Sequence, residues 1–398
     1  MLSEADRIEA LEAAQKLVAC LSENSESSRS ESTRVLALRI TNHVIRSLEK
    51  PEDGLMKFAY SPTIWMAIRT CVQLNVFNIL VEKETTSARE IAERSGADEA
   101  LLRRLLRVLT SYGYVAEKGD GLYGVNKWTK HMQNRLTQGM IKFIFDESMP
   151  AITAAPEFFK DNGFQNPVDP RNGPYQKGLG IDVPIFPWLA LPENKERWDA
   201  ANTFFEGDRG SRPSWVTWFP VKDELLSGKI DDLAPLLVDV AGGRGHDLME
   251  FLDQFPSVTG KYVLQDQQQV LDSAISLPPA VEKRAFDFFN EAPVEGAKIY
   301  FMKFIMHDYA DPEALRILKH IRSSMKKGYS YLVINDFILP DTGCSLIAAE
   351  WDLMMLTLMS SMERTESQWR NLLGAAGLSI KGLYQPPGDG QGIILATL

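Results

Sequence analysis

Residues 236–251 have the sequence LLVDVAGGRGHDLMEF. The apolar run predicts a buried β-strand, the glycines predict a tight turn, and the pattern after them predicts the first turns of a helix. Gly243 and Gly245 lack a Cβ, so they can adopt positive φ and let the backbone approach a nucleotide-like ligand. Alone, this unit is weak evidence, because dinucleotides, other nucleotides and purely structural turns compete for it.

A second acidic residue, at the end of the next predicted strand, indicates which kind of ligand the turn binds. Asp266 ends the next predicted strand, KYVLQD, where a carboxylate can accept hydrogen bonds from both hydroxyls of a ribose. Asp239, near the end of the first strand, can accept a hydrogen bond from a cationic amine. A dinucleotide is disfavoured, because GGRGHD lacks the third glycine of GxGxxG and the turn lies past the middle of the chain. The sequence therefore predicts an adenosine-type site.

The C-terminal half alternates apolar strands with helices. The expected strands lie in LLVDVAG, KYVLQD, AKIYFMK, YSYLVINDFIL and GIILATL. This alternation predicts the α/β class, with a Rossmann-like, doubly wound and mostly parallel sheet. In such sheets, ligands bind beyond the carboxyl ends of the strands.

The N-terminal half is helical. Residues 1–55 contain two helical patterns separated by the serine-rich run SENSESSRSES, which predicts a flexible linker. Residues 56–150 contain three helical patterns followed by a GDG-centred hairpin, which together predict a winged helix. Residues 151–398 form the predicted ligand-binding domain, in which 151–225 supply connecting helices.

Net charge decides between two uses of the winged helix. Arg103, Arg104 and Arg107 lie on the helix that a DNA-binding protein would place in the major groove. The chain of 398 residues carries a formal net charge of −10, which repels nucleic acid and anionic membranes. We therefore expect a packing and dimerisation module, with no nucleic-acid or membrane partner.

The remaining composition indicates a cytoplasmic globular protein. Three widely spaced cysteines form no CxxC pair and suggest neither a disulfide framework nor a metal site. The acidic N-terminus does not resemble a secretory signal, and no apolar run reaches about 18 residues.

Large apolar side chains concentrate between residues 140 and 220 and again between 354 and 362. They could line a pocket for a bulky, flat molecule, or they could simply form core. The side chains expected to face a substrate are Phe145, Trp188, Phe204, Arg209, Met355 and Met359.

Two later motifs favour one family. FMKFIMHDYADPEALRIL places His307 where an apolar strand meets a loop, and MERTESQWRNLLGAAGL follows a long helical pattern. With LVDVAGGRG, the acid of LQD and the AFDFF segment, they make the chain resemble the plant-and-fungal type of S-adenosylmethionine-dependent O-methyltransferases. The resemblance covers roughly residues 60–398. It implies a methyltransferase fold preceded by a dimerisation domain, and a homodimer acting on a small molecule.

The resemblance also implies roles for individual residues. S-adenosylmethionine would be held by Asp239, Gly243, Gly245, Asp266, Asp287, Phe288 and Lys303. His307 would be the general base that deprotonates a substrate hydroxyl, and Glu363 would orient it. The chemistry is consistent: an imidazole with a pKa near 6.5 can accept the proton of a phenol as the phenol attacks, and no metal is needed.

Three positions depart from the family pattern. Ala241 replaces the first glycine of VGGGxG, and we expect the turn to avoid positive φ there. Asp336 replaces a glutamate beside the catalytic histidine and is one methylene shorter, which puts its reach in question. Ser360 and Ser361 replace paired glycines before Glu363, so the loop presenting this carboxylate could differ.

These departures keep a second activity open. Some fungal proteins that resemble this family catalyse pericyclic reactions, such as dehydration with cycloaddition or an Alder-ene step, and bind S-adenosylmethionine without using its methyl group. In such an enzyme Lys303, Arg209 and His307 would polarise a substrate carbonyl.

Overall fold

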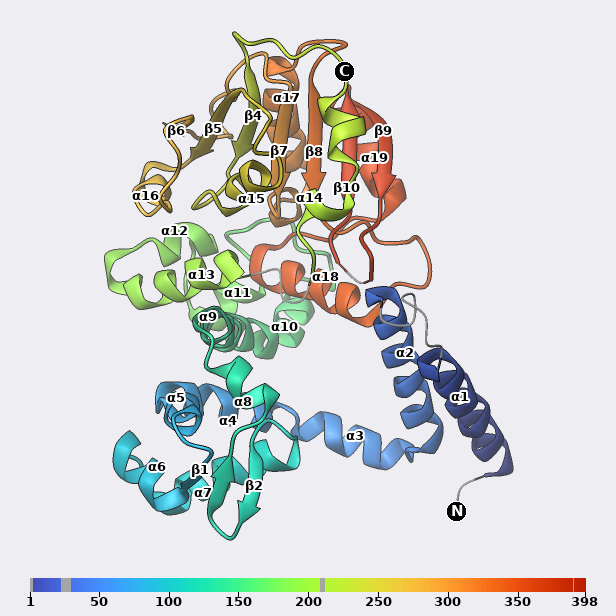
Figure 1. The fold of residues 1–398 in the computed structure, drawn as a ribbon, viewed down its shortest axis with the longest axis vertical. Helices are drawn as coiled ribbons and strands as arrows, with labels where there is room; N and C mark the ends of the chain where they lie inside the picture. The colour runs from blue at the N-terminus through green and yellow to red at the C-terminus, as the bar shows by residue number, and fades with distance from the viewer. Residues whose placement is uncertain (1–2, 23–29, 208–211, 389) are drawn as a thin grey trace. The chain divides into compact units, whose positions relative to one another are not determined.

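The computed structural model describes residues 3–22, 30–207, 212–388 and 390–398 (Figure 1). The chain forms two compact units. The N-terminal unit comprises Met1–Met149 and Leu189–Asp208, and the C-terminal unit comprises Pro150–Trp188 and Arg209–Leu398. Most of the predicted serine-rich linker, and Arg209, lie outside the described residues.

Paired helices open the N-terminal unit. Helix α1 packs along α2, which begins at its N-cap Ser30, whose hydroxyl accepts the N–H of Thr33. The helices up to the first strand are α1 (Glu4–Ser22), α2 (Glu31–Leu48), α3 (Pro51–Tyr60), α4 (Pro62–Gln73) and α5 (Val76–Val81).

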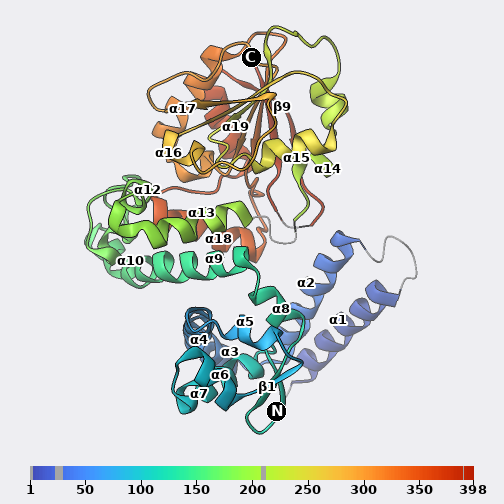
Figure 2. The ribbon, with the colours of Figure 1, turned by 60° about the vertical axis from the view of Figure 1, so that its left-hand side comes forward.

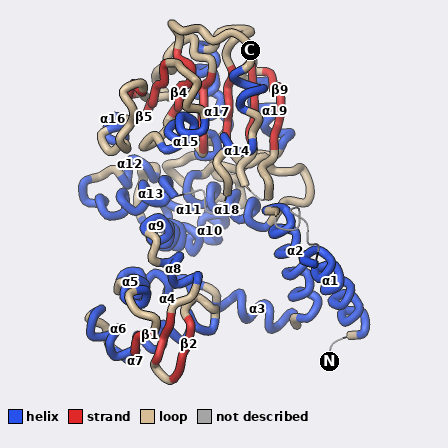
Figure 3. The backbone as a smooth tube through the Cα atoms, in the orientation of Figure 1, coloured by secondary structure: helices blue, strands red, loops and turns tan. Residues whose placement is uncertain are grey.

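The predicted winged helix is confirmed. Ser87 and Asp98 cap the N-termini of two of its helices, and Gly96 ends the first of them with φ +71°. The expected GDG hairpin connects two strands of a three-stranded antiparallel sheet, and the order of the strands in this sheet is β1-β3-β2 (Figure 3). The elements are β1 (Thr85–Ser87), α6 (Ala88–Ser95), α7 (Glu99–Ser111), β2 (Ala116–Gly119), β3 (Leu122–Gly124), α8 (Lys127–Met132) and α9 (Arg135–Phe143).

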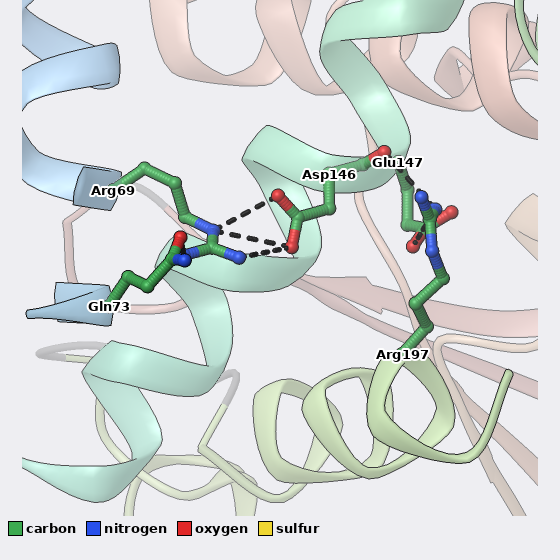
Figure 4. Close-up of polar contacts among 5 residues, drawn as sticks. All are labelled: Arg69, Gln73, Asp146, Glu147 and Arg197. Atoms are coloured by element: carbon green, nitrogen blue, oxygen red, sulfur yellow. Dashed lines mark hydrogen bonds and ion pairs between the residues drawn. The ribbon is translucent and has the colours of Figure 1, made fainter.

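A short π-helix, η2 (Ile144–Ser148), carries two adjacent acidic residues that form ion pairs with arginines of two other helices of this unit (Figure 4). Arg69 of α4 donates to Asp146, with Nη2 2.9 Å from Oδ2. Arg197 of α13 (Lys195–Gly207), which follows η3 (Pro192–Asn194), donates to the buried Glu147 at 2.9 Å. The π-helix therefore anchors two helices that are distant in sequence.

The C-terminal unit is built on the predicted doubly wound sheet. Its strand order is β6-β5-β4-β7-β8-β10-β9, with parallel pairing from β6 to β8 and antiparallel pairing of β10 with both neighbours. The strands are β4 (Pro235–Val240), β5 (Lys261–Asp266), β6 (Val281–Ala285), β7 (Ile299–Lys303), β8 (Tyr331–Asn335), β9 (Ser379–Tyr384) and β10 (Ile393–Thr397). β6 and β9 were not among the expected strands.

Helices cover both faces of this sheet (Figure 2). α17 (Asp311–Ser324) and α19 (Glu366–Ala375) pack on one face, and α14 (Trp215–Trp218) and α15 (His246–Gln254) pack on the other. The remaining elements are α10 (Met149–Asp161), α11 (Pro174–Leu179), α12 (Ile185–Leu189), η4 (Lys222–Leu226), α16 (Gln268–Leu271), η5 (Met306–Asp308) and α18 (Leu346–Met359). Within the described residues, none of the helices combines the length and apolarity needed to cross a membrane.

The turn after β4 corrects one expectation. Ala241 was expected to avoid positive φ, but it has φ +56°. The turn keeps the left-handed conformation that suits glycine, because the backbone must fold back over the end of β4 to reach Gly243 and Gly245. An L-residue in this region costs about 1–2 kcal/mol, because its Cβ approaches the following carbonyl oxygen.

Ala241→Gly should therefore stabilise the protein. We expect the free energy of unfolding to rise by about 0.5–1 kcal/mol, since relief of the strain exceeds the added entropy of an unfolded glycine. Differential scanning calorimetry would show this as a higher melting temperature. The control is Ala274→Gly, at a half-buried alanine outside the positive-φ residues, which should lower it. A lower melting temperature for Ala241→Gly would contradict the strain at this position.

Candidate active site

His307 lies in η5, just beyond the carboxyl end of β7, and is 5% exposed. Its Nδ1 is 2.6 Å from Oε1 of Glu363, and its Nε2 is 3.4 Å from Oδ1 of Asp308. Phe304 packs against the imidazole with ring centroids 5.2 Å apart, and Trp351 in turn stacks on Phe304. Carboxylates thus bracket both ring nitrogens, while aromatic rings hold the plane of the imidazole.

The loop that carries Glu363 follows α18. Ser360 ends this helix with φ +54°, so a serine adopts the left-handed conformation that favours glycine. Asp352 of α18 accepts the backbone N–H of Glu363 at 2.8 Å, which fixes the residue on the helix. The serines therefore leave Glu363 within reach of His307.

Arg364, which is completely buried, connects this loop to the histidine loop. Its guanidinium donates to the carbonyl oxygens of Met306 and Tyr309, both at 2.7 Å, and to Oδ1 of Asp311 at 2.8 Å. Arg364, which follows Glu363 in sequence, is therefore hydrogen-bonded to the residues on both sides of the His307–Asp308 pair.

The ionisable side chains around His307 strongly change one another's pKa. Burial by itself lowers the pKa of His307, but the attraction of Glu363, Asp308 and Asp336 outweighs it and raises that pKa to about 10. Burial raises the pKa of Asp308 to about 7, although the imidazolium pulls in the opposite direction. The imidazole consequently holds its proton at neutral pH.

Asp336 does not contact the histidine. It is fully buried, and burial raises its pKa to about 6. Within the described part of the chain, the carboxylates in ion-pair contact with His307 are Glu363 and Asp308. The shorter side chain acts on the histidine only through space, and Asp308 takes the position beside the imidazole.

The glycine turn and the end of β5 form a cradle. A Cβ on Gly242 would lie 2.3 Å from Cγ of Asp239, so only glycine leaves room for this buried carboxylate. The N–H of Gly243 donates to Oδ2 of Asp266 at 2.8 Å, which ties the turn to β5. The structure thus brings the two acids predicted for an adenosine-type ligand to neighbouring strand ends, and these residues fit such a ligand.

The other predicted ligand-binding residues lie around the same edge of the sheet. Asp287 accepts the N–H of Phe289 and is thereby held in the loop after β6. Phe288 packs edge-on against Tyr309, with centroids 5.6 Å apart. Lys303, at the end of β7, forms an ion pair with Asp247 at 3.3 Å.

The predicted substrate-facing residues are divided between the two units. Phe145 and Phe204 belong to the N-terminal unit, where Phe204 stacks on Phe143 with centroids 5.3 Å apart. Trp188, Met355 and Met359 belong to the C-terminal unit. Among the residues that the structure describes, no group of three or more His, Cys, Asp or Glu side chains could hold a metal ion.

The sequence interpretation noted Asp308 only as the acid that follows His307, and it missed Asp352 and Arg364. All three contact the His307–Glu363 pair or its loops. Arg364 stands next to Glu363 in sequence, so it could have been considered, whereas no pattern marks Asp352 as the acceptor for the backbone of Glu363.

Comparison with known proteins identifies the family. Two family models match the chain, an O-methyltransferase domain over residues 221–379 and an O-methyltransferase dimerisation domain over residues 56–130. The O-methyltransferase penC of Penicillium thymicola is 34% identical over 361 residues, which cover 90% of each protein. The chain belongs to this O-methyltransferase family.

Solved structures show the same architecture. A structure of LepI in complex with SAM is 27% identical, with a TM-score of 0.87 over 100% of both chains. Another, described as a pericyclic reaction enzyme, is 27% identical, with a TM-score of 0.88 over 98% of this chain and 100% of that one. The protein is an enzyme of the class I methyltransferase fold, and its cofactor is S-adenosylmethionine.

Removing Arg364 should destabilise the protein. Arg364→Met removes the donors of the buried carbonyl of Met306 and the partly buried carbonyl of Tyr309, so we expect the free energy of unfolding to fall by about 2–4 kcal/mol. The control is Arg370→Met, which removes a half-exposed arginine paired with Glu366 on α19. It should change stability by less than about 0.5 kcal/mol. Urea denaturation would measure both; equal effects would contradict the anchoring role of Arg364.

Proposed function

We propose that the protein methylates a hydroxyl group of an aromatic or polyketide-type secondary metabolite, with His307 as general base and Glu363 as the carboxylate that orients it. The observation that carries this proposal is the buried 2.6 Å contact between Nδ1 of His307 and Glu363 at the carboxyl end of β7. The substrate class rests on the fungal relative and on the apolar Trp188, Met355 and Met359.

The cofactor would lie along the cradle at the strand ends. Asp239 and the glycines at 243 and 245 would hold its methionine portion, Asp266 the ribose, and Asp287 with Phe288 the adenine. Lys303 would lie beside it. The cradle supports this placement, because the Gly243–Asp266 hydrogen bond fixes the backbone that would face the ligand.

His307 moves the proton in this mechanism. S-adenosylmethionine supplies an electrophilic methyl group on its sulfonium sulfur. In the neutral form of His307, which is the minority form below its raised pKa, Nδ1–H is donated to Glu363 and the Nε2 lone pair accepts the proton of the substrate hydroxyl as the oxygen attacks. Asp308, 3.4 Å from Nε2, then stabilises the imidazolium. The buried aromatic surroundings exclude water.

A pericyclic activity is the second candidate. One solved structure of the same fold is described as a pericyclic reaction enzyme. The raised pKa of His307 also favours an imidazolium, which could donate a hydrogen bond to a substrate carbonyl. In that case the cofactor would be bound and not consumed.

The substitution His307→Ala tests the proposal. We expect kcat for methyl transfer to fall by about 10²–10⁴, because the general base is lost, while cofactor affinity is retained. The measurement is mass spectrometry of S-adenosylhomocysteine and of products heavier by one methyl group, across a panel of phenols and polyketide alcohols. The matched control is His320→Ala, on α17, which should keep full activity.

An isomerised or dehydrated product with the cofactor unconsumed would replace the methyltransferase proposal with the pericyclic one. Full methyl transfer by His307→Ala would remove the histidine from the mechanism.

The pH dependence separates the two candidates. Below its pKa of about 10, His307 is mostly protonated and cannot act as a base. For methyl transfer to a phenol, kcat/KM should therefore rise by about tenfold per pH unit between about pH 7 and 9. A reaction that uses the imidazolium as a donor should instead be flat there and decline above the pKa. A flat methylation profile would contradict the base role of His307.

We further propose a cytoplasmic homodimer, with residues 56–150 as dimerisation domain and 151–398 as catalytic domain. Helix α3 has no buried residue, although it carries Leu55, Met56, Phe58 and Tyr60. Such a row of apolar side chains fits a protein interface. Its C-terminal part overlaps the match to the family's dimerisation domain. The three cysteines remain thiols, which suits the cytoplasm.

Charges on α3 should dissociate this dimer. We expect the double variant Leu55→Glu, Phe58→Glu to elute as a monomer in size-exclusion chromatography with light scattering, whereas the unmodified protein elutes as a dimer. The control is Phe164→Glu, because Phe164 is 77% exposed, as is Phe58, but lies in the C-terminal unit. A monomeric unmodified protein would refute the dimer.

A further inference from the structure

Phe304, the residue that directly follows β7, has a strained backbone. Its φ is +52°, a left-handed conformation that a bulky side chain rarely adopts. Such a conformation costs free energy and persists only where the surrounding structure holds it, most often at functional sites. Glycine would adopt the same φ without strain, so an aromatic residue here indicates that the ring itself has a task.

The ring of Phe304 contacts both the imidazole of His307 and an indole of α18. Its centroid lies 5.2 Å from that of His307, and it stacks on Trp351 at 5.8 Å with an interplanar angle of 6°. The ring of Phe337, which is 3% exposed, contacts Trp351 at a centroid distance of 5.3 Å. The carbonyl of Phe337 accepts the indole N–H of Trp369 at 3.0 Å. Aromatic contacts therefore connect the histidine to a residue that is fixed just beyond β8.

Such a support is needed because the hydrogen bond to Glu363 holds only one atom of the imidazole. The torsion χ2 of a histidine has broad energy wells, so a ring held at Nδ1 can still tilt. Asp308, 3.4 Å from Nε2, is long for a hydrogen bond at the other nitrogen. Contact with the ring of Phe304 is what limits the tilt, and with it the direction of Nε2.

Helix α18 carries this support on the same face as two of the proposed substrate-facing residues. Trp351, Met355 and Met359 are spaced four residues apart, so their side chains lie along one face of the helix. Met355 is 8% exposed and Met359 is 7% exposed. The element proposed to contact the substrate is therefore also the element that supports the general base.

We propose that Trp351 is a positioning residue of the reaction: through the ring of Phe304 it sets the plane of the His307 imidazole, so that Nε2 points to the hydroxyl of a substrate bound on the same helix. Asp352, the next residue of α18, accepts the backbone N–H of Glu363 at 2.8 Å. One helix thus aligns both members of the catalytic pair. The inference rests on the proposed general-base role of His307.

Steady-state kinetics of methyl transfer test this role. Trp351→Leu removes the stacked indole, so kcat should fall by about tenfold or more, because a misaligned base loses its reactive geometry. Phe304→Leu removes the middle ring and should give a similar loss. KM for the acceptor and Kd for S-adenosylhomocysteine should change by less than about threefold in both variants. Trp351→Phe keeps an aromatic ring against Phe304 and should restore kcat to within about threefold of that of the unmodified protein.

The matched control is Phe337→Leu, which removes a ring of the same small apolar cluster but leaves the stack of Trp351 on Phe304 in place. Like Trp351→Leu, it should lower the melting temperature, whereas its kcat should stay within about twofold of that of the unmodified protein. Equal losses of kcat in Phe337→Leu and Trp351→Leu would mean that the cluster serves stability alone and would overturn the proposal. A raised KM with unchanged kcat in Trp351→Leu would also overturn it, by assigning the indole to substrate binding.

Nuclear magnetic resonance observes the imidazole directly and requires no turnover. The chain has 5 histidines, so ¹³C labelling at Cε1 gives few signals, and the signal of His307 is the one lost in His307→Ala. In Trp351→Leu this signal should shift and broaden, because the imidazole gains freedom beside Phe304, whereas in Trp351→Phe and Phe337→Leu it should stay in place. An unchanged signal in Trp351→Leu would overturn the positioning role.

The two kinds of measurement separate this inference from the proposed function. An unmodified protein without methyl transfer would contradict the proposed function, and the resonance of His307 would still decide whether Trp351 orients the imidazole. Normal methyl transfer with unchanged kcat in Trp351→Leu would leave the proposed function in place and remove the role of Trp351.

Discussion

A hydrogen bond between a histidine and a carboxylate, buried away from water, is the constraint on which the catalytic unit depends. His307 and Glu363 are 56 positions apart, and each would be costly to bury alone. The surrounding structure compensates: Arg364 bonds the carbonyls on both sides of the histidine loop, and Asp352 holds the backbone of Glu363. The sheet places His307 at the end of β7, while these hydrogen bonds orient His307 and Glu363 toward each other.

The excess of negative charge around His307 has a chemical consequence. Glu363, Asp308 and Asp336 together raise the pKa of the imidazole far above that of a free histidine. A base of this kind accepts a proton strongly but seldom has its lone pair available at neutral pH. The same cluster would suit a cationic donor, which is the role that a pericyclic reaction would require of His307.

The sequence predicted the C-terminal architecture well, because buried parallel strands consist of unbroken apolar runs. β6 was not predicted, because VEKRA is mostly exposed and charged. β9 was not predicted, because SIKGLY lies at the edge of the sheet. His307 and Glu363 could be paired because each lies in a recognisable motif. Asp352 could not, because its bond to a backbone N–H depends on the angle at which α18 ends.

The left-handed residues Ala241 and Ser360 have a consequence for how such proteins are recognised. Both positions have the positive φ that glycine adopts most easily, yet each carries a side chain. The turn therefore requires a pair of dihedral angles, and glycine is only the residue that adopts them at the least cost. A pattern that requires glycine at these positions does not match this chain, whereas one that asks which backbone the turn must adopt does.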